Sequence, residues 1–135
     1  MTEKNEQSLF ERAGGEPALR RVIVEFYDRV FADAMIGFHF RGSDRQRLIE
    51  KELELASSLL GADVRYTGKP MREVHAKHHI FGGHFMRRLQ ILREVLEEQA
   101  LPPEVRAAWI EHTLKLMPQI TKDAPDECRM PEGES

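Results

Sequence analysis

The stretch PALRRVIVEFYDRVFAD, residues 17 to 33, decides the fold, because its apolar side chains recur with the period of a helix. Neighbouring apolar positions are mostly three or four residues apart, which places them on one face of an α-helix. They are Leu19, Val22, Ile23, Phe26, Tyr27 and Val30. Pro17 suits the first turn of such a helix, where an amide hydrogen has no partner inside the helix. The stretch therefore predicts a long amphipathic helix with one buried face.

A second helix is predicted after the connecting segment AMIGFHFRG. Ser43 or Asp44 can cap its first turn, and Gly61 can end it after Leu60. One face of this helix carries three leucines with a single acidic residue among them: Leu48, Leu55, Leu59 and Glu52.

The rest of the chain continues in helices separated by glycine and proline. Residues 62 to 69 are expected to form a loop, and Pro70 to open a short helix that Gly82 and Gly83 close. A third long helix is predicted from 84 to 99, with Phe85, Leu89, Leu92 and Leu96 inward. Pro102-Pro103 starts the last helix, which carries Val105, Trp109, Ile110, Leu114 and Met117. Because no alternating strand pattern is visible, the sequence predicts an all-α domain.

Length and charge limit the kinds of partner. The 135 residues fit a single domain, expected over 1–121, followed by a flexible polar tail at 122–135. The 20 basic and 23 acidic residues give a net charge of -3, and the basic residues do not gather into a patch for nucleic acid. One cysteine excludes an internal disulfide. No apolar run approaches the ~18 residues that cross a bilayer, so we expect a soluble cytoplasmic protein with no membrane partner.

Four of the six histidines lie between residues 75 and 84, namely His75, His78, His79 and His84. One interpretation is zinc, because His75 and His79 are one helical turn apart, although no thiolate or HExxH pattern supplies further ligands. A second is that one neutral imidazole ligates an iron that a macrocycle already holds. A third is that all four are exposed or satisfied in the core; for His84, in the first turn of the next helix, we expect exposure. The spacing of the histidines alone favours this third interpretation.

Taken together, the residues from about Leu9 to Thr121 resemble the truncated haemoglobins, which are short globins with a two-on-two helical sandwich. The most specific piece is YTGKPMREVH, residues 66 to 75, which is similar to the segment that ends in the proximal histidine of that family. LFERAGGEPAL, the pair Phe26 and Tyr27, and GFHF agree in order and spacing. The resemblance is strongest to the first group of the family.

The resemblance assigns roles to individual residues. It makes His75 the proximal iron ligand of a haem b (iron protoporphyrin IX) and Tyr27 the distal tyrosine. It places the following residues around the haem: Phe40, Leu48, Lys51, Glu52, Leu55, Ala56, Tyr66, Met71, Ile80 and Phe85. His78 or His79 could donate a hydrogen bond to a haem propionate, although exposure to solvent is an equal alternative.

Glu52 departs from the family pattern, which commonly has a glutamine there. A glutamine amide can donate a hydrogen bond to a bound gas, whereas an ionised carboxylate only accepts. If Glu52 faces the pocket, burial favours its protonated form, which can donate; the alternative is that it tilts to the rim and stays hydrated. We expect the Tyr27 hydroxyl and Glu52 to form a hydrogen-bonded pair.

Lys51 and the glycine pair raise two smaller questions. Lys51 occupies a position from which some relatives supply a sixth iron ligand; the alternative is a lysine that pairs with a propionate or with solvent. The family has two pairs of adjacent glycines. The first is present here as Gly14-Gly15, and the second is incomplete, reading Gly61-Ala62. An alanine is tolerated at that position if its φ is negative.

The function that the resemblance implies is binding of oxygen, and of other diatomic gases such as nitric oxide, at the haem iron. The protein would then store, transport or sense oxygen. As an enzyme it would instead oxidise nitric oxide to nitrate, and it would need a separate reductase because no GxGxxG motif is present. A third possibility is a globin-like interaction module that has lost haem.

Overall fold

The computed structural model describes residues 7–67 and 82–116, and every regular element in these ranges is a helix. In chain order the elements are α1 (Leu9–Ala13), α2 (Gly15–Ala32), the short 3-10 helix η1 (Gly37–Phe40), α3 (Arg45–Leu59), α5 (Gly82–Glu98) and α6 (Pro103–Lys115). The all-α prediction is confirmed. None of these helices is both long and apolar enough to cross a membrane.

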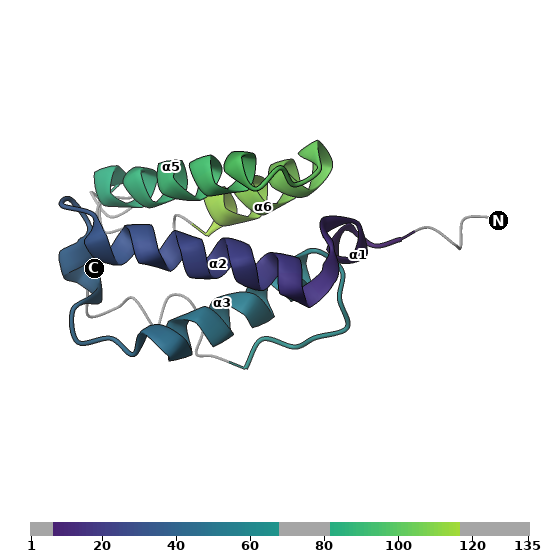
Figure 1. Ribbon diagram of the computed structural model, residues 1–135, viewed down its shortest axis with the longest axis horizontal. Helices are drawn as coiled ribbons and strands as arrows, with labels where there is room; N and C mark the ends of the chain where they lie inside the picture. The colour runs from purple at the N-terminus through teal and green to yellow at the C-terminus, as the bar shows by residue number, and fades with distance from the viewer. Residues whose placement is uncertain (1–6, 68–81, 117–135) are drawn as a thin grey trace, which may run out of the picture.

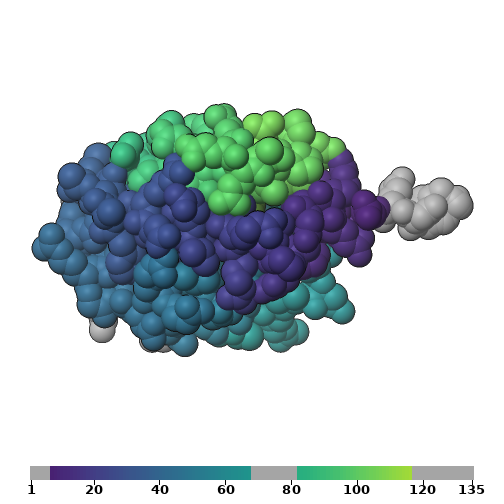
Figure 2. Space-filling view, in the orientation of Figure 1, coloured from purple at the N-terminus to yellow at the C-terminus, as the bar shows by residue number. Residues whose placement is uncertain are grey.

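Two pairs of helices form two layers, with α2 at the centre (Figure 1). Helix α2 packs against α3 on one side and against α5 on the other, and α5 in turn contacts α6. In the space-filling view the outer surface of α2 forms a band between the α5 and α6 layer and α3 (Figure 2). The pair α2 and α3 thus faces the pair α5 and α6, as the two-on-two prediction requires.

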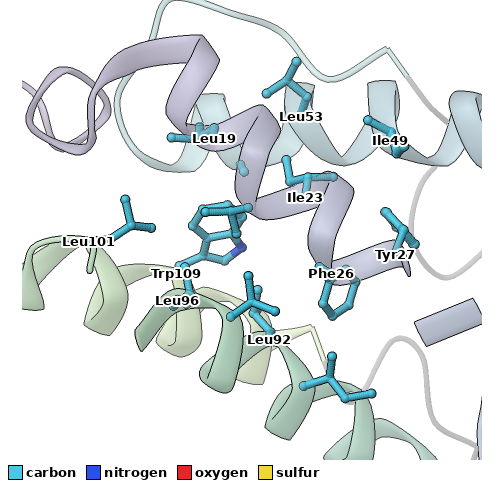
Figure 3. Packing of buried hydrophobic residues seen from close by; sticks show 14 of the residues in the cluster. Leu19, Ile23, Phe26, Tyr27, Ile49, Leu53, Leu92, Leu96, Leu101 and Trp109 are labelled. Carbon is cyan, nitrogen blue, oxygen red and sulfur yellow. The ribbon is translucent and has the colours of Figure 1, made fainter. Parts of the chain in front are cut away.

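The core forms where the predicted stripe of α2 meets the other helices (Figure 3). All six apolar positions of the stripe are buried, from Leu19 at one end to Val30 at the other. Trp109 of α6 lies in the middle of this core with 1% of its surface exposed. The inward residues predicted on α5 are buried too: Phe85, Leu89, Leu92 and Leu96.

Helix α3 has the predicted ends but a different core face. The Asp44 side chain accepts a hydrogen bond from the Arg47 amide at 3.3 Å, and Gly61 follows the helix with φ of 101°. Ala62 has no positive φ, so alanine is tolerated there as predicted. The buried residues of the helix are Ile49, Leu53, Ala56 and Ser57, and Leu60, which follows it, is buried too. The predicted face with Leu48, Leu55 and Leu59 lies beside them and is only partly buried.

Two details of the helices were not predicted. Helix α1 was missed, although Ser8 and Glu11 form a capping box in which each side chain accepts a hydrogen bond from the backbone amide of the other. Gly82 and Gly83 belong to α5, and the short helix predicted from Pro70 lies outside the described residues. The α5 prediction from His84 onward was therefore two residues short.

A tight corner joins α2 to η1 and to α5. The Asp33 carboxylate accepts two hydrogen bonds from the Arg87 guanidinium, at 2.7 and 2.9 Å, and one each from the amides of Met35 and Ile36. These contacts hold the pKa of Asp33 below its usual range. Gly37, the first residue of η1, is buried next to this corner, so the contacts of Asp33 fix the position at which η1 begins.

Gly37→Ala is expected to destabilise the fold by about 1–3 kcal/mol, the usual cost of overpacking a core. An added Cβ would lie 2.7 Å from the backbone oxygen of Phe31, which cannot move without disturbing α2. The matched control is Gly83→Ala, whose Cβ would make an ordinary 3.8 Å contact with Met35. Thermal unfolding checks both variants, and a Gly37→Ala melting temperature equal to that of Gly83→Ala would contradict this explanation.

Candidate functional site

Tyr27 lies on the buried stripe of α2 with 5% of its surface exposed. Its ring packs edge to face against Phe26, Phe31 and Phe40, with centroids 5.0 to 6.4 Å apart. Burial, and next the negative charge of Glu52, raise the pKa of the Tyr27 hydroxyl. The hydroxyl is therefore a neutral donor at physiological pH.

Glu52 of α3 is a nearly buried acid, with 14% of its side chain exposed. Burial raises the pKa of its carboxyl. The positive charge of Arg88 and the indole N–H of Trp109 act in the opposite direction, although Trp109 Nε1 does not reach hydrogen-bond geometry. Of the two alternatives for Glu52, the structure supports the buried carboxyl.

Arg88 of α5 completes this cluster, and the sequence did not predict it. Its Nη2 lies 3.6 Å from Oε1 of Glu52, and its Cζ lies 4.8 Å from the centre of the Phe26 ring. Arg88 also acts on the Tyr27 hydroxyl and offsets part of the rise in its pKa. No hydrogen bond joins Tyr27 to Glu52 within residues 7–67 and 82–116, so the partner of Glu52 is an arginine and not the expected tyrosine.

The predicted lining residues that the structure describes lie near this cluster. Phe85 and Ala56 are buried, and the others are partly buried: Phe40, Leu48, Leu55 and Tyr66. Burial, followed by the charges of Glu52 and Glu54, raises the pKa of the Tyr66 hydroxyl. The described lining is therefore mostly apolar, with a polar group at its centre.

Lys51 is engaged at the edge of this lining. Its Nζ donates a hydrogen bond to Thr67 Oγ1 at 2.5 Å and lies 3.7 Å from Glu54 Oε2. The amine thus contacts both α3 and the segment that follows it, and the role of Lys51 toward a haem stays a prediction.

The histidines divide into those that the structure describes and those outside it. His84 was expected to be exposed, but it is partly buried and its Nδ1 lies 3.3 Å from Nε2 of His39. His112 is partly buried, which lowers its pKa. The predicted ligand His75 lies outside the described residues, as do Met71, His78, His79 and Ile80.

In the described part of the chain, no three histidine, cysteine or acidic side chains are grouped so that they could hold a metal ion. A hollow of about 600 Å³ lies at the other end of α2, between α1 and the turn that joins α5 to α6. It is remote from Tyr27. The polar cluster of Tyr27, Glu52 and Arg88, with its apolar surroundings, is therefore the candidate site.

Comparison with known proteins identifies the family. The bacterial-like globin family model matches residues 8–124. The chain is 34% identical, over 113 residues, to the group 1 truncated haemoglobin GlbN of Mycolicibacterium paratuberculosis; the match covers 84% of this chain and 83% of that protein. The chain belongs to the group 1 truncated haemoglobins. These globins are haem proteins that bind diatomic gases.

Other relatives agree with this membership. The group 1 truncated haemoglobin of Tetrahymena pyriformis is 31% identical, over 82% of this chain and 94% of its own length. Its crystal structure in the Fe(III) form has a TM-score of 0.77 to this truncated haemoglobin at 24% identity, covering 87% of this chain and 100% of that one. Haemoglobin from Chloroflexus aurantiacus has a TM-score of 0.76 at 24% identity, covering 87% and 99%. These two structures support the fold.

The described residues fit a haem. A structural core has little reason to bury a tyrosine hydroxyl, an acid and a cation together, because buried polar groups need partners. The buried indole N–H of Trp109 also lacks a hydrogen-bond partner in the described part of the chain. A mostly apolar wall with a few converging polar groups is what a haem and a small polar ligand require.

Proposed function

We propose that this truncated haemoglobin binds oxygen at a haem b whose iron is held by His75, with Tyr27 as the main hydrogen-bond donor to the gas. The observation that carries the proposal is the buried Tyr27 hydroxyl, which faces Glu52 and Arg88 among the partly buried apolar residues of α3 and η1. When bound, the ferrous haem supplies the coordination position for the gas.

The residues of the chain would hold the bound gas by hydrogen bonds and keep water away from it. The raised pKa of Tyr27 keeps its proton in place, so the hydroxyl can donate to the negative charge that develops on oxygen. Glu52 can donate in its neutral form and repels such a ligand in its ionised form. Phe40, Leu48 and Leu55 exclude water from this side of the ring, which strengthens the polar contacts.

Variants of the Tetrahymena pyriformis protein support the positions of Tyr27 and Glu52. Its solved structures include one with a tyrosine changed to phenylalanine and another with a glutamine, 25 positions further along, changed to glutamate. Tyr27 and Glu52 stand the same 25 positions apart (52 less 27). This equal spacing supports the proposal that Glu52 stands where the second of these variants introduces a glutamate.

The test is reversible oxygen binding. The purified haem-loaded protein would be reduced and its visible absorption followed while oxygen is added and then removed. The proposal expects a ferrous spectrum that changes with oxygen and returns when the oxygen is withdrawn. A stable haem protein whose ferrous spectrum does not change when oxygen is added would overturn the proposal.

Oxidation of nitric oxide to nitrate stays a prediction, because no described residue favours it over simple binding. Each nitrate would consume one nitric oxide, one oxygen and one electron, so a separate reductase would be a partner. Nitric oxide consumption by the oxygenated protein, measured with a reductant present, distinguishes the two functions. Storage, transport and sensing all predict no sustained turnover.

A further inference from the structure

Arg88 brings a positive charge to the side of the molecule where we place the gas. It lies on α5 with 23% of its side chain exposed, next to the buried Phe85 and Leu89. The Phe26 ring under its guanidinium holds the flat group in place. Tyr27 and Glu52 approach the same group from α2 and α3. Three helices thus meet at one cation.

The pairing of Arg88 with Glu52 is loose. Its 3.6 Å separation exceeds a hydrogen bond, whereas the adjacent Arg87 holds Asp33 through two hydrogen bonds of 2.7 and 2.9 Å. A guanidinium has five N–H donors in a fixed plane. In the described part of the chain, Glu52 is the only acid that pairs with Arg88. Most of these donors are therefore available to another acceptor.

We propose that Arg88 makes this side of the protein a binding site for small monovalent anions, which replace Glu52 as the partner of the guanidinium. The inference rests on the proposed haem site, because the anion would sit where the gas does. Tyr27 donates a second hydrogen bond to the anion. The ligand class is the small anions that bind ferric iron, for which azide is the probe.

Replacement of Glu52 couples the anion to a proton. Ionised Glu52 depends on Arg88 as its positive partner, and the other groups that face it are neutral: the hydroxyls of Tyr27 and Tyr66 and the Trp109 indole. Once the anion holds Arg88, the carboxylate is left without a partner, and burial favours its neutral acid. The anion therefore enters together with a proton.

The experiment measures the dissociation constant of azide for the ferric haem-loaded protein by absorption titration. Arg88→Met is expected to weaken azide binding about tenfold to a hundredfold, the effect of losing a charge-assisted hydrogen bond. Glu52→Gln is expected to tighten binding, because it removes the competing carboxylate. The double variant should bind azide as weakly as Arg88→Met does, because the gain in Glu52→Gln depends on Arg88.

Arg93→Met is the matched control, since it removes the same charge from the same helix and should leave the azide constant unchanged. Carbon monoxide binding to the ferrous form serves as a neutral ligand, and Arg88→Met should change it far less than azide binding. Arg88→Lys retains the charge without the planar donors, and it should give an intermediate azide constant.

The pH dependence gives a second readout. From pH 5.5 to 7.5, azide affinity in the starting protein should fall more steeply with rising pH than in Glu52→Gln, because only the former takes up a proton on Glu52. Equal slopes would overturn the proton coupling, and equal azide constants in Arg88→Met and Arg93→Met would overturn the anion site. If either of these results is obtained with a protein that still binds haem and carbon monoxide, the proposed function is unaffected. A protein that binds no haem contradicts both.

Discussion

Tyr27→Phe is expected to release oxygen from the ferrous protein about tenfold to a hundredfold faster, because it removes a buried hydrogen bond to a partly charged acceptor. The Tyr27 ring is fixed by Phe26, Phe31 and Phe40, so phenylalanine should keep the packing and lose only the hydroxyl. Association should change little, because loss of a contact acts mainly on dissociation. Flash photolysis and stopped-flow mixing measure the two rates separately.

Thr113→Val is the control for this experiment. Thr113 is also buried, but its hydroxyl donates to the backbone oxygen of Trp109 within α6. Removing that hydroxyl should alter stability and leave oxygen release as it was. If both variants release oxygen at the original rate, the Tyr27 hydroxyl does not donate to the gas.

His75→Ala is expected to abolish the Soret band of a histidine-ligated haem, because the resemblance makes this imidazole the only bond from the protein to the iron. The polar cluster on α2, α3 and α5 should be unaffected, so the variant should keep its helical circular dichroism. Added imidazole, which can replace the missing side chain, should restore much of the band. Absorption spectra with and without imidazole check both expectations.

His112→Ala is the corresponding control among the remaining histidines. Its imidazole is partly buried on α6, and its Nε2 has no hydrogen-bond partner in the described part of the chain. This variant should retain the haem spectrum. A His75→Ala protein with an unaltered spectrum would show that another side chain holds the iron.

The fold was predictable because its helices obey simple periodic rules. The α2 stripe from Leu19 to Val30 needed only the spacing of apolar residues, and Asp44 and Gly61 marked the ends of α3. The core face of α3 was less predictable, since leucines and isoleucines cover much of the helix and spacing does not say which of them meets α2. Helix α1 has only 5 residues, too few for the spacing of apolar side chains to indicate a helix, and its capping box was the only signal in the sequence.

The site was predictable from family resemblance and only partly from chemistry. The resemblance named Tyr27 and Glu52, and their position as polar residues on or beside apolar stripes agreed with it. Arg88 was missed, because charged residues on amphipathic helices usually face water. One signal was present: Arg88 follows Phe85 by three residues and precedes Leu92 by four, which places it on the buried face of α5. The roles of His75 and the cytoplasmic location stay predictions.

Titration of the haem-free protein with haemin, followed by the fluorescence of Trp109, tests the central claim most directly. Trp109 is the only tryptophan and is buried next to Glu52, so a haem bound at this site should quench its emission by energy transfer. We predict that the emission falls steadily to a sharp break at an equimolar amount of haemin while a Soret band rises. A shallow decline without a break, in a folded and colourless protein, would contradict the haem site and favour a globin that serves as an interaction module.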